Sequence, residues 1–434
     1  MNLNFLFRLK FFVLLSFVFI SLSTVGNRHE KPAVIITQDG EVDDRSSFVR
    51  FLLYTPDIDL RGVVATNSKW QKNGHGLEWI YEAYDLYDKV RENLLQHNPD
   101  YPTVEFLKSI TVLGNENPEH LTGDAPYVDS EGSELILREL LKIEDKLLHI
   151  NCWGGANTVA QALWKFRKNY PEECKTNISK VRVIAITFQD EAGDWIVNNM
   201  PEVRIIKNNA FHMTWNYHNE EPLKHNPYPQ MMSEKWLSEN VKKNHGPLGA
   251  WYPQKNISEG DTPAFLNFVD NGLETWNDYS SGGWGGRYQP VSGNYWSDAT
   301  DDNNMQKTLW RWIPAVQNDF AARMDWCVKS YDEANHQPVL EEVTVPGTVK
   351  PGQKVELKAT ASDPDADKVY YWWWHYPDPS GRNNPIKIVH ETSDNAHFTV
   401  PENSVKDIHI ILEVSDDGSP ELKSYKRLIF NMKK

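Results

Sequence analysis

Cysteine is scarce in this chain of 434 residues, which contains only Cys152, Cys174 and Cys327. An exported fold that depends on a disulfide framework carries several paired cysteines, so that class of scaffold is excluded. The chain also lacks a Cys-x-x-Cys spacing or a Cys/His cluster, which argues against a structural zinc site. One disulfide stays open, but we expect buried free thiols.

Positive charge is also in deficit. The chain has 45 Lys and Arg residues against 60 Asp and Glu residues, which gives a formal net charge of -15. Nucleic-acid binding draws on clustered basic side chains that displace counterions, so we expect no nucleic-acid partner. A neutral or cationic ligand suits this composition better.

Long apolar runs are absent except at the beginning, where residues 11–22 follow Arg8 and Lys10 and precede small residues near Gly26. A membrane-spanning helix needs about 20 apolar residues, and this run is shorter. Basic residues, a short apolar run and small residues predict a signal peptide over residues 1–26. We therefore expect a secreted or periplasmic bacterial protein with no membrane segment after cleavage.

From residue 33 onward, short β-branched runs alternate with helical patterns. This alternation is typical of parallel α/β sheets, in which ligands bind at the carboxyl ends of the strands. We expect strands at 33–37, 60–66, 146–152, 181–187 and 203–206, and helices at 46–54, 77–95, 133–143 (with Ser133 as the N-cap) and 305–330. Residues 214–308 are rich in Trp, Tyr, Asn, Gly and Pro, which predicts loops that lie over the site.

The end of the chain changes to alternation with a period of two. Val355, Leu357, Ala359 and Ala361 form one such series, and Ile408, Ile410, Leu412 and Val414 form another. Short strands with turn signals over about ninety residues predict a small immunoglobulin-like sandwich. We therefore expect an α/β domain at 33–330, a linker at 331–340 and an all-β domain at 341–434.

Three aspartates, Asp39, Asp43 and Asp44, gather in a glycine-containing turn directly after the first predicted strand. Carboxylates held together repel one another unless protons or a cation neutralise them, and Ca²⁺ is a hard, oxygen-liganded ion that does this. The alternative is a solvated acidic turn, since negative charge is also favourable at the beginning of a helix. The spacing alone leaves both interpretations open.

Three segments carry a resemblance to nucleoside hydrolases, in the same order along the chain. They are Thr37-Gln38-Asp39-Gly40-Glu41-Val42-Asp43-Asp44, then Gly154-Gly155-Ala156-Asn157-Thr158-Val159-Ala160-Gln161-Ala162-Leu163, then Gly260-Asp261-Thr262-Pro263-Ala264-Phe265-Leu266. The resemblance covers residues 33–330 and implies a mostly parallel sheet flanked by helices. It also implies a Ca²⁺ site built from Asp39, Asp44, the carbonyl of Asn157 and Asp261.

A closer resemblance is to nucleoside-hydrolase-like bacterial proteins, some labelled cellulose-binding, that end in an immunoglobulin-like domain. Three further segments carry it: Gln189-Asp190-Glu191-Ala192-Gly193-Asp194-Trp195, Trp310-Arg311-Trp312, and Asn318-Asp319-Phe320-Ala321-Ala322-Arg323-Met324-Asp325-Trp326. Two positions depart from the nucleoside-specific pattern. Thr37 stands where a further aspartate is usual, and Gly260 stands where a histidine helps to protonate the leaving base.

The resemblance implies that Asp39 accepts a proton from a metal-bound water that attacks the anomeric carbon. Asp43 would then bind a sugar hydroxyl, and Asn67, Gln189 and Asp190 are further candidates for sugar contact. Gln189 and Asp190 have an equal alternative as caps of the following helix. His75, His212 and His218 are weaker candidates for the acid that protonates the leaving group.

The chain has 17 tryptophans, whose faces can stack on sugar rings or pack in cores. Trp70, Trp153, Trp251 and Trp284 fall in loops that we expect near the pocket, whereas Trp310, Trp312 and Trp326 suit packing. The Trp372-Trp373-Trp374 run must alternate faces in a strand, which favours a domain contact over a carbohydrate platform. For Asp363, Asp365 and Asp367 a plain turn is favoured over a structural calcium site.

The sequence therefore predicts an exported calcium-dependent hydrolase that cleaves an N-ribosyl or O-glycosyl bond of a sugar-containing small molecule or oligosaccharide. The alternative is a non-catalytic protein on the same fold that binds cellulose or another wall polysaccharide. The retained carboxylates favour the enzyme, because a binding protein has no need of a complete metal site. The substrate and the formation of homo-oligomers stay open.

Overall fold

The computed structural model describes residues 31–120, 129–213, 215, 226–345, 348–381, 384–403 and 407–432. The predicted signal peptide and His218 lie outside the described residues, and so does the side chain of His212. Residues Pro32–Lys434 form a single unit, in which an α/β domain precedes an all-β domain. This order of domains confirms the predicted fold class.

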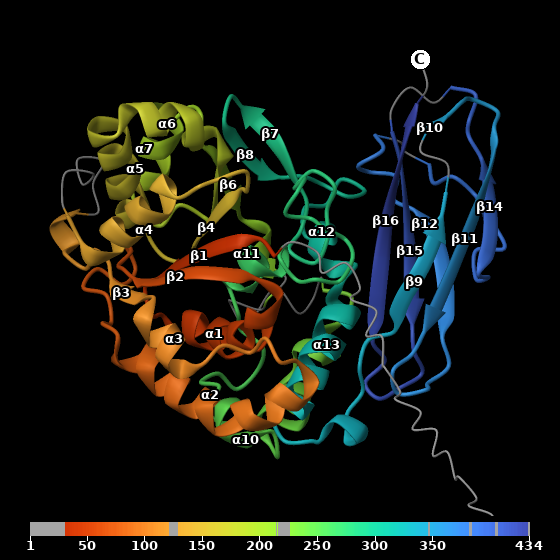
Figure 1. The fold of residues 1–434 in the computed structure, drawn as a ribbon, viewed down its shortest axis with the longest axis horizontal. Coiled ribbons are helices and arrows are strands. Elements are labelled where there is room, and N and C mark those ends of the chain that lie inside the picture. Colours follow the sequence, from red (N-terminus) through yellow and green to blue (C-terminus); the bar gives the residue numbers. More distant parts are fainter. Residues whose placement is uncertain are drawn as a thin grey trace, which may run out of the picture. The chain divides into compact units, whose positions relative to one another are not determined.

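An eight-stranded sheet forms the centre of the α/β domain, in the order β3-β2-β1-β4-β5-β6-β8-β7 (Figure 1). Neighbouring strands pair in parallel except β7 and β8, which are antiparallel. The strands are β1 Ala33–Gln38, β2 Asp59–Ala65, β3 Thr111–Leu113, β4 Leu148–Cys152, β5 Val181–Ile186, β6 Arg204–Asn208, β7 Tyr288–Ser292 and β8 Tyr295–Asp298. The order reverses beside β1, which lies between β2 and β4, and ligands bind at such a point in open α/β sheets.

Helices cover both faces of the sheet, so alternate side chains of β1 enter two different cores. Val34 and Ile36 belong to one core with residues of α1 and α2, and Ile35 belongs to the other with residues of α4 and α5. Figure 1 shows α1 and α2 on one face of the sheet and α4 and α5 on the other. The helices before β6 are α1 Val42–Tyr54, α2 Glu78–His97, α3 Val104–Ser109, α4 Glu131–Leu141, α5 Asn157–Asn169, α6 Pro171–Asn177 and α7 Ala192–Asn199.

Two predicted helix beginnings are corrected. Helix α1 begins at Val42 and not at residue 46, so Asp43 and Asp44 lie in its first turn. Helix α4 is capped by Ser130, whose hydroxyl accepts a hydrogen bond from the amide of Ser133 at 3.1 Å. Ser133 is the third residue of the helix and not the N-cap, because its own hydroxyl completes the capping box from inside the helix.

The segment predicted as loops also contains regular structure, including α9 Glu234–Leu237, α10 Gly246–Ala250, α11 Thr262–Leu266 and the β7–β8 hairpin. The expected helix at 305–330 is divided into α12 Lys307–Trp310 and α13 Ile313–Asp325. Pro314 lies in the first turn of α13, where the missing amide hydrogen costs no helical hydrogen bond. Strands β3, β7 and β8 were not predicted, because they are short or carry polar, exposed residues.

Two four-stranded sheets form the C-terminal domain, in the orders β10-β16-β15-β12 and β13-β14-β11-β9. Their strands are β9 Val339–Thr344, β10 Thr348–Val349, β11 Lys354–Ser362, β12 Tyr370–His375, β13 Ile388–Val389, β14 Asn395–Thr399, β15 Ile408–Ser415 and β16 Lys423–Met432. Val355, Leu357 and Ala359 pack against Ile410 and Leu412 in a shared core, as the period-two pattern predicts. Strand β9 begins inside the segment predicted as a linker.

The two domains also contact each other directly. The Tyr376 hydroxyl donates to Asp301 Oδ2 at 2.6 Å, and the Tyr425 amide donates to the Asn271 carbonyl at 2.8 Å. Trp374 packs against Trp312 with ring centroids 5.9 Å apart, whereas Trp373 is buried inside the sandwich. The tryptophan run therefore includes a domain contact, although Trp372 remains 46% exposed.

The three cysteines are buried free thiols. Asp363 Oδ1 accepts hydrogen bonds from the amides of Asp365 and Asp367, which is the plain turn expected there. In the part of the chain that the structure describes, no helix is long and apolar enough to cross a membrane.

Candidate functional site

A tight turn joins β1 to α1 and carries the first aspartates. Gly40 has a φ of +77°, and a Cβ there would lie 2.8 Å from His75 Cβ and 2.9 Å from Trp79 Nε1. Only glycine suits this left-handed and crowded position. The turn therefore brings Asp39 and the first turn of α1 together at the carboxyl end of the sheet.

Four buried aspartates meet at this turn. The Asp39 amide donates to Asp44 Oδ1 at 3.1 Å, and the Glu41 amide donates to Asp39 Oδ1 at 3.3 Å. Asp43, Asp44 and Asp261 offer carboxylate oxygens that all lie within 4.8 Å of one another, and Asp39, Glu41 and Asp44 do the same. The structure thus brings Asp261 from a distant segment to the three aspartates of the first motif.

Burial is the largest cause of raised pKa values in this cluster. It raises the pKa of Asp39, and burial together with the charges of Glu41 and Asp39 raises the pKa of Asp43 to about 8. The pKa values of Asp44 and Asp261 lie well above the usual range, because burial is reinforced by the neighbouring carboxylates. Without a cation, the folded protein therefore favours protonated carboxyl groups at this site.

Several of the carboxylate oxygens have no partner. Asp39 Oδ2, Asp43 Oδ1 and Asp261 Oδ2 are buried and accept no hydrogen bond from any described residue. No ion pair between these aspartates and a described lysine or arginine is present either. Unpaired buried oxygens beside one another are the donor set that a hard divalent cation prefers, so the residues fit such an ion.

A buried ion pair fixes the loop that carries Asp261. Arg50 of α1 donates from Nε to Glu259 Oε2 at 2.6 Å and from Nη2 to Glu259 Oε1 at 3.1 Å. The Thr262 hydroxyl lies 2.8 Å from Glu259 Oε2 and 3.2 Å from Ser47 Oγ. The turns of helix α1 that follow Asp43 and Asp44 therefore hold the loop that carries Asp261 in place.

Asn67, Asn157 and Asp190 form a second buried group beside the aspartates. Asn157 Nδ2 donates to Asn67 Oδ1 at 2.9 Å and to Asp190 Oδ2 at 3.0 Å, and the Asn157 amide donates to the same Asp190 oxygen at 2.9 Å. Asp190 Oδ1 also accepts from the Ala192 amide at 3.0 Å, at the beginning of α7. Burial raises the pKa of Asp190 to about 6, against these hydrogen bonds.

Two glycines allow the loop after β4 to approach this group. A Cβ on Gly154 would lie 2.8 Å from Asp39 Cβ, and a Cβ on Gly155 would lie 2.4 Å from Asp190 Oδ2. Gln189 Nε2 donates to the carbonyls of Trp153 and Ile186, while its Oε1 has no described partner. The loops after β1, β2, β4 and β5 therefore meet at one place.

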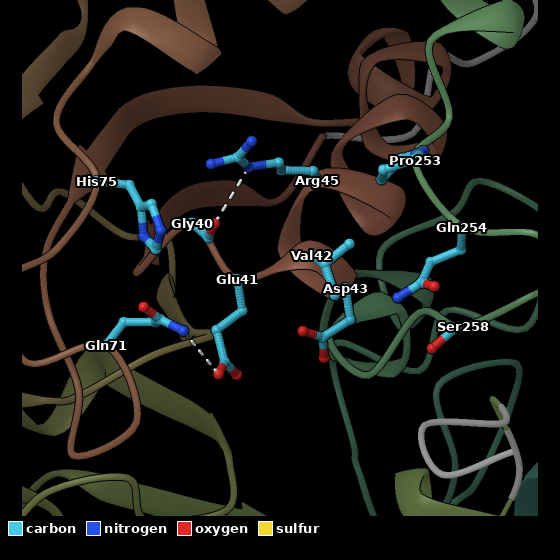
Figure 2. Close-up of a pocket in the computed structure, with 10 residues that line it drawn as sticks. All are labelled: Gly40, Glu41, Val42, Asp43, Arg45, Gln71, His75, Pro253, Gln254 and Ser258. Carbon is cyan, nitrogen blue, oxygen red and sulfur yellow. Dashed lines mark hydrogen bonds between the residues drawn. The ribbon is translucent and has the colours of Figure 1, made fainter.

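A cavity of about 500 Å³ opens on the turn. Figure 2 shows its lining from three segments: the β1–α1 turn, the loop after β2, and residues 253–258. The lining residues are Gly40, Glu41, Val42, Asp43, Arg45, Gln71, His75, Pro253, Gln254 and Ser258. Most of them are polar, and His75 contributes the only aromatic ring in this set.

The predicted site residues divide into two groups. Asp43 lines the cavity, and Asp39, Asp44 and Asp261 lie buried around it, whereas Asn67, Gln189 and Asp190 are outside the lining. The hydrogen bonds of Asn67 and Asp190 hold neighbouring loops, and contact of these three residues with a sugar stays a prediction.

The prediction did not include Glu41, Arg45, Gln71, Gln254 or Ser258 among the site residues. Glu41 and Arg45 flank the aspartates in the sequence, so proximity to the motif could have identified them. Gln71 Nε2 donates to Glu41 Oε1 at 3.2 Å. His75, a weaker candidate, does line the cavity, and its Nδ1 lies 2.9 Å from the Asp39 carbonyl oxygen.

The tryptophans expected near the pocket also differ from one another. Trp153 and Trp284 are buried in the core, with Trp153 packed against Phe51 and Phe265 beneath the aspartates. Trp251 is partly buried, and Trp70 is 62% exposed on the loop that carries Gln71. Trp70 is therefore the member of this group that is free to meet a ligand.

Comparison with known families gives two matches. Residues 33–288 match the family model described as cellulose-binding Sde182, nucleoside hydrolase-like domain, and residues 354–432 match the C-terminal domain of cellulose-binding protein Sde0182. No curated protein matches the chain.

Among solved structures, a nucleoside hydrolase-related hypothetical protein from Saccharophagus degradans, associated with carbohydrate metabolism, is 32% identical with a TM-score of 0.80. The alignment covers 93% of this chain and 100% of that one. An endo-beta-1,4-mannanase from Thermotoga petrophila has 9% identity and a TM-score of 0.15, which is too low to indicate a shared fold. The chain belongs to the Sde182 family of cellulose-binding proteins with a nucleoside hydrolase-like domain.

Proposed function

We propose that the protein is an exported, Ca²⁺-dependent hydrolase that cleaves a glycosidic bond with a metal-activated water. The observation that carries this proposal is the group of buried aspartates, Asp43, Asp44 and Asp261, whose oxygens lie within 4.8 Å of one another. Uncompensated buried carboxylates are costly, and a fold keeps them where function needs them.

Calcium is the ion that we propose, because it accepts several carboxylate and carbonyl oxygens in a flexible arrangement. Asp39, Asp44, Asp261 and the main-chain carbonyl of Asn157 would hold it, as in the nucleoside hydrolases that the motifs resemble. When bound, the ion supplies a water of lowered pKa and a contact for sugar hydroxyls.

The residues of the chain then have separate roles. Asp39 accepts the proton of the attacking water, and Asp43, which lines the cavity, accepts a hydrogen bond from a sugar hydroxyl. The negative charges of the cluster stabilise the oxocarbenium-like transition state, whose positive charge develops only during the reaction. Asn67, Gln189 and Asp190 support the loops around the sugar or contact it.

The polar lining favours a sugar over a nucleobase as the group that enters the cavity. Stacking on a base uses aromatic side chains, whereas Glu41, Gln71 and Gln254 offer hydrogen bonds to hydroxyl groups. Gly260, which stands where nucleoside-specific enzymes have a histidine, agrees with this choice. We therefore place oligosaccharides of the cell wall ahead of nucleosides as substrates.

The test is release of free sugar from nucleosides, aryl glycosides and wall oligosaccharides, with calcium or with a chelator. We expect turnover that is lost on chelation and falls at least 100-fold in Asp39→Asn, with Asp194→Asn, an exposed carboxylate in α7, as the matched control. Turnover that survives both chelation and Asp39→Asn would overturn the mechanism.

The second candidate is a binding protein without turnover, which the cellulose-binding description of the family favours. Calcium-dependent binding of a sugar with no release of product from any compound in the panel would establish this function instead.

The proposed export rests on the signal-like residues 1–26, and cell fractionation tests it. The oligomeric state is a separate measurement by analytical ultracentrifugation.

A further inference from the structure

Trp70 is the most exposed large apolar side chain in the described part of the chain, at 62%. Burying an indole stabilises a folded protein strongly. An indole that stays exposed to water near the cavity contributes none of this free energy to the fold. Its backbone is nevertheless well ordered by hydrogen bonds.

Hydrogen bonds fix the loop on both sides of Trp70. The Ser68 hydroxyl accepts from the amides of Trp70 and Gln71, each at 3.1 Å, and the Ser68 amide donates to the Gln71 carbonyl at 3.2 Å. Lys69 donates from its amide to the Gln189 carbonyl at 2.8 Å, and its Nζ lies 5.0 Å from the Trp70 ring centroid. The indole therefore stands on a rigid support, which lowers the entropy lost when a ligand stacks on it.

The same loop joins Trp70 to the cavity. Gln71, the next residue, lines the cavity, and its Nε2 donates to Glu41 Oε1 at 3.2 Å. One short turn thus presents a polar group inside the cavity and an aromatic face outside it. A ligand that uses both must extend beyond the cavity.

We infer that Trp70 forms a sugar-stacking subsite at the mouth of the cavity, so the ligand is an oligosaccharide of at least two units. One unit occupies the polar cavity against Asp43 and Gln71, and the next stacks on the indole face. Sugar rings carry apolar C–H faces that suit such contact, and a nucleoside has no second sugar to place there. This inference rests on the proposed function, because it assumes that the cavity holds a sugar.

The experiment is calorimetric titration of the calcium-loaded full chain with mono-, di- and tetrasaccharides of the cello-, xylo- and manno- series. We expect affinity to rise from monosaccharide to disaccharide. Trp70→Ala should lower the affinity for the disaccharide about tenfold, while the affinity for the monosaccharide stays within about twofold of the wild type. Trp70→Phe keeps an aromatic face and should retain most of the affinity for the disaccharide. Tyr170→Ala, which removes an exposed aromatic residue at the end of α5, is the matched control.

The outcomes separate this inference from the proposed function. Equal length dependence in the wild type and in Trp70→Ala overturns the stacking subsite, as does a wild type that binds all lengths equally, and neither result affects the metal-water mechanism. A change of oligomeric state in Trp70→Ala, measured by ultracentrifugation, would show that the indole meets a second copy of the chain instead. A wild type that binds no sugar of any series overturns the stacking subsite, whereas the hydrolase stands or falls on the release of free sugar from the wider panel described above.

Discussion

Glu259 and Asp261 are two residues apart, and both carboxyl groups are buried, but their surroundings differ completely. Glu259 accepts from Nε and Nη2 of the Arg50 guanidinium and also from the Tyr252 hydroxyl at 2.9 Å. Asp261 instead faces Asp43 and Asp44, and its Oδ2 has no described partner. The fold can therefore neutralise a buried carboxylate in this loop, and it leaves one beside it unneutralised.

Asp319 repeats the first of these arrangements. It accepts from Arg323 Nε at 3.0 Å and from the Tyr54 hydroxyl at 2.5 Å, and Arg323 also donates to Asp57 at 2.9 Å. Glu259 and Asp319 thus each have an arginine as the partner of a buried carboxylate. The aspartate cluster has no such partner among the described residues, and this contrast supports the proposed cation.

The largest effect should follow from breaking the compensated pair. Arg50→Met leaves Glu259 buried without its cation, and we expect the free energy of unfolding to fall by about 3–5 kcal/mol. Denaturant unfolding measures this change. A loss of under about 1 kcal/mol would show that Glu259 is neutralised in another way.

The uncompensated cluster should respond to the ion itself. Calcium at 100 times its dissociation constant should stabilise the wild type by about 2.7 kcal/mol, and Asp44→Asn should lose most of this gain. Thermal unfolding with calcium or chelator measures the difference, with Asp194→Asn as the control. An equal calcium effect in Asp44→Asn would place the ion elsewhere.

The pH dependence of the chelated protein sharpens the same contrast. The pKa of Asp43 is about 8 in the folded state and about 3.9 in an unfolded chain, so the folded state binds the proton more tightly. The contribution of this proton to stability should therefore be fully present below about pH 4 and be lost as pH rises from there through about 8, by up to about 1.4 kcal/mol per pH unit. Calcium should flatten this slope. A chelated protein whose stability is independent of pH over this range would contradict the raised pKa.

The smallest effect is expected at the surface. Arg61 lies 2.5 Å from Asp59 but is 40% exposed, so its charge is screened by water. Arg61→Met should change the free energy of unfolding by less than about 1 kcal/mol in the same denaturant assay. A change as large as that of Arg50→Met would show that burial does not determine how much each ion pair contributes to the free energy of unfolding.

Local sequence predicted much of this architecture, because Asp39, Asp43 and Asp44 lie in one motif after a β-branched run. The register of alternate side chains likewise predicted the sandwich core around Leu357 and Leu412. Contacts between residues that are distant in the sequence have no local pattern that predicts them. Arg50 and Glu259, for example, are 209 residues apart. Gln254 and Ser258 lie in an aperiodic segment, so only the folded chain shows that they line the cavity.

The separation between Asp44 and Asp261 also bears on when the site forms. A chain that must close a long loop loses conformational entropy before the contact at the end of the loop can stabilise it. We therefore expect the aspartates of the first motif to meet Asp261 late in folding, after the central sheet has been assembled. We expect an ion held by all of them to slow unfolding without nucleating folding, so the proposed calcium would set the lifetime of the native protein.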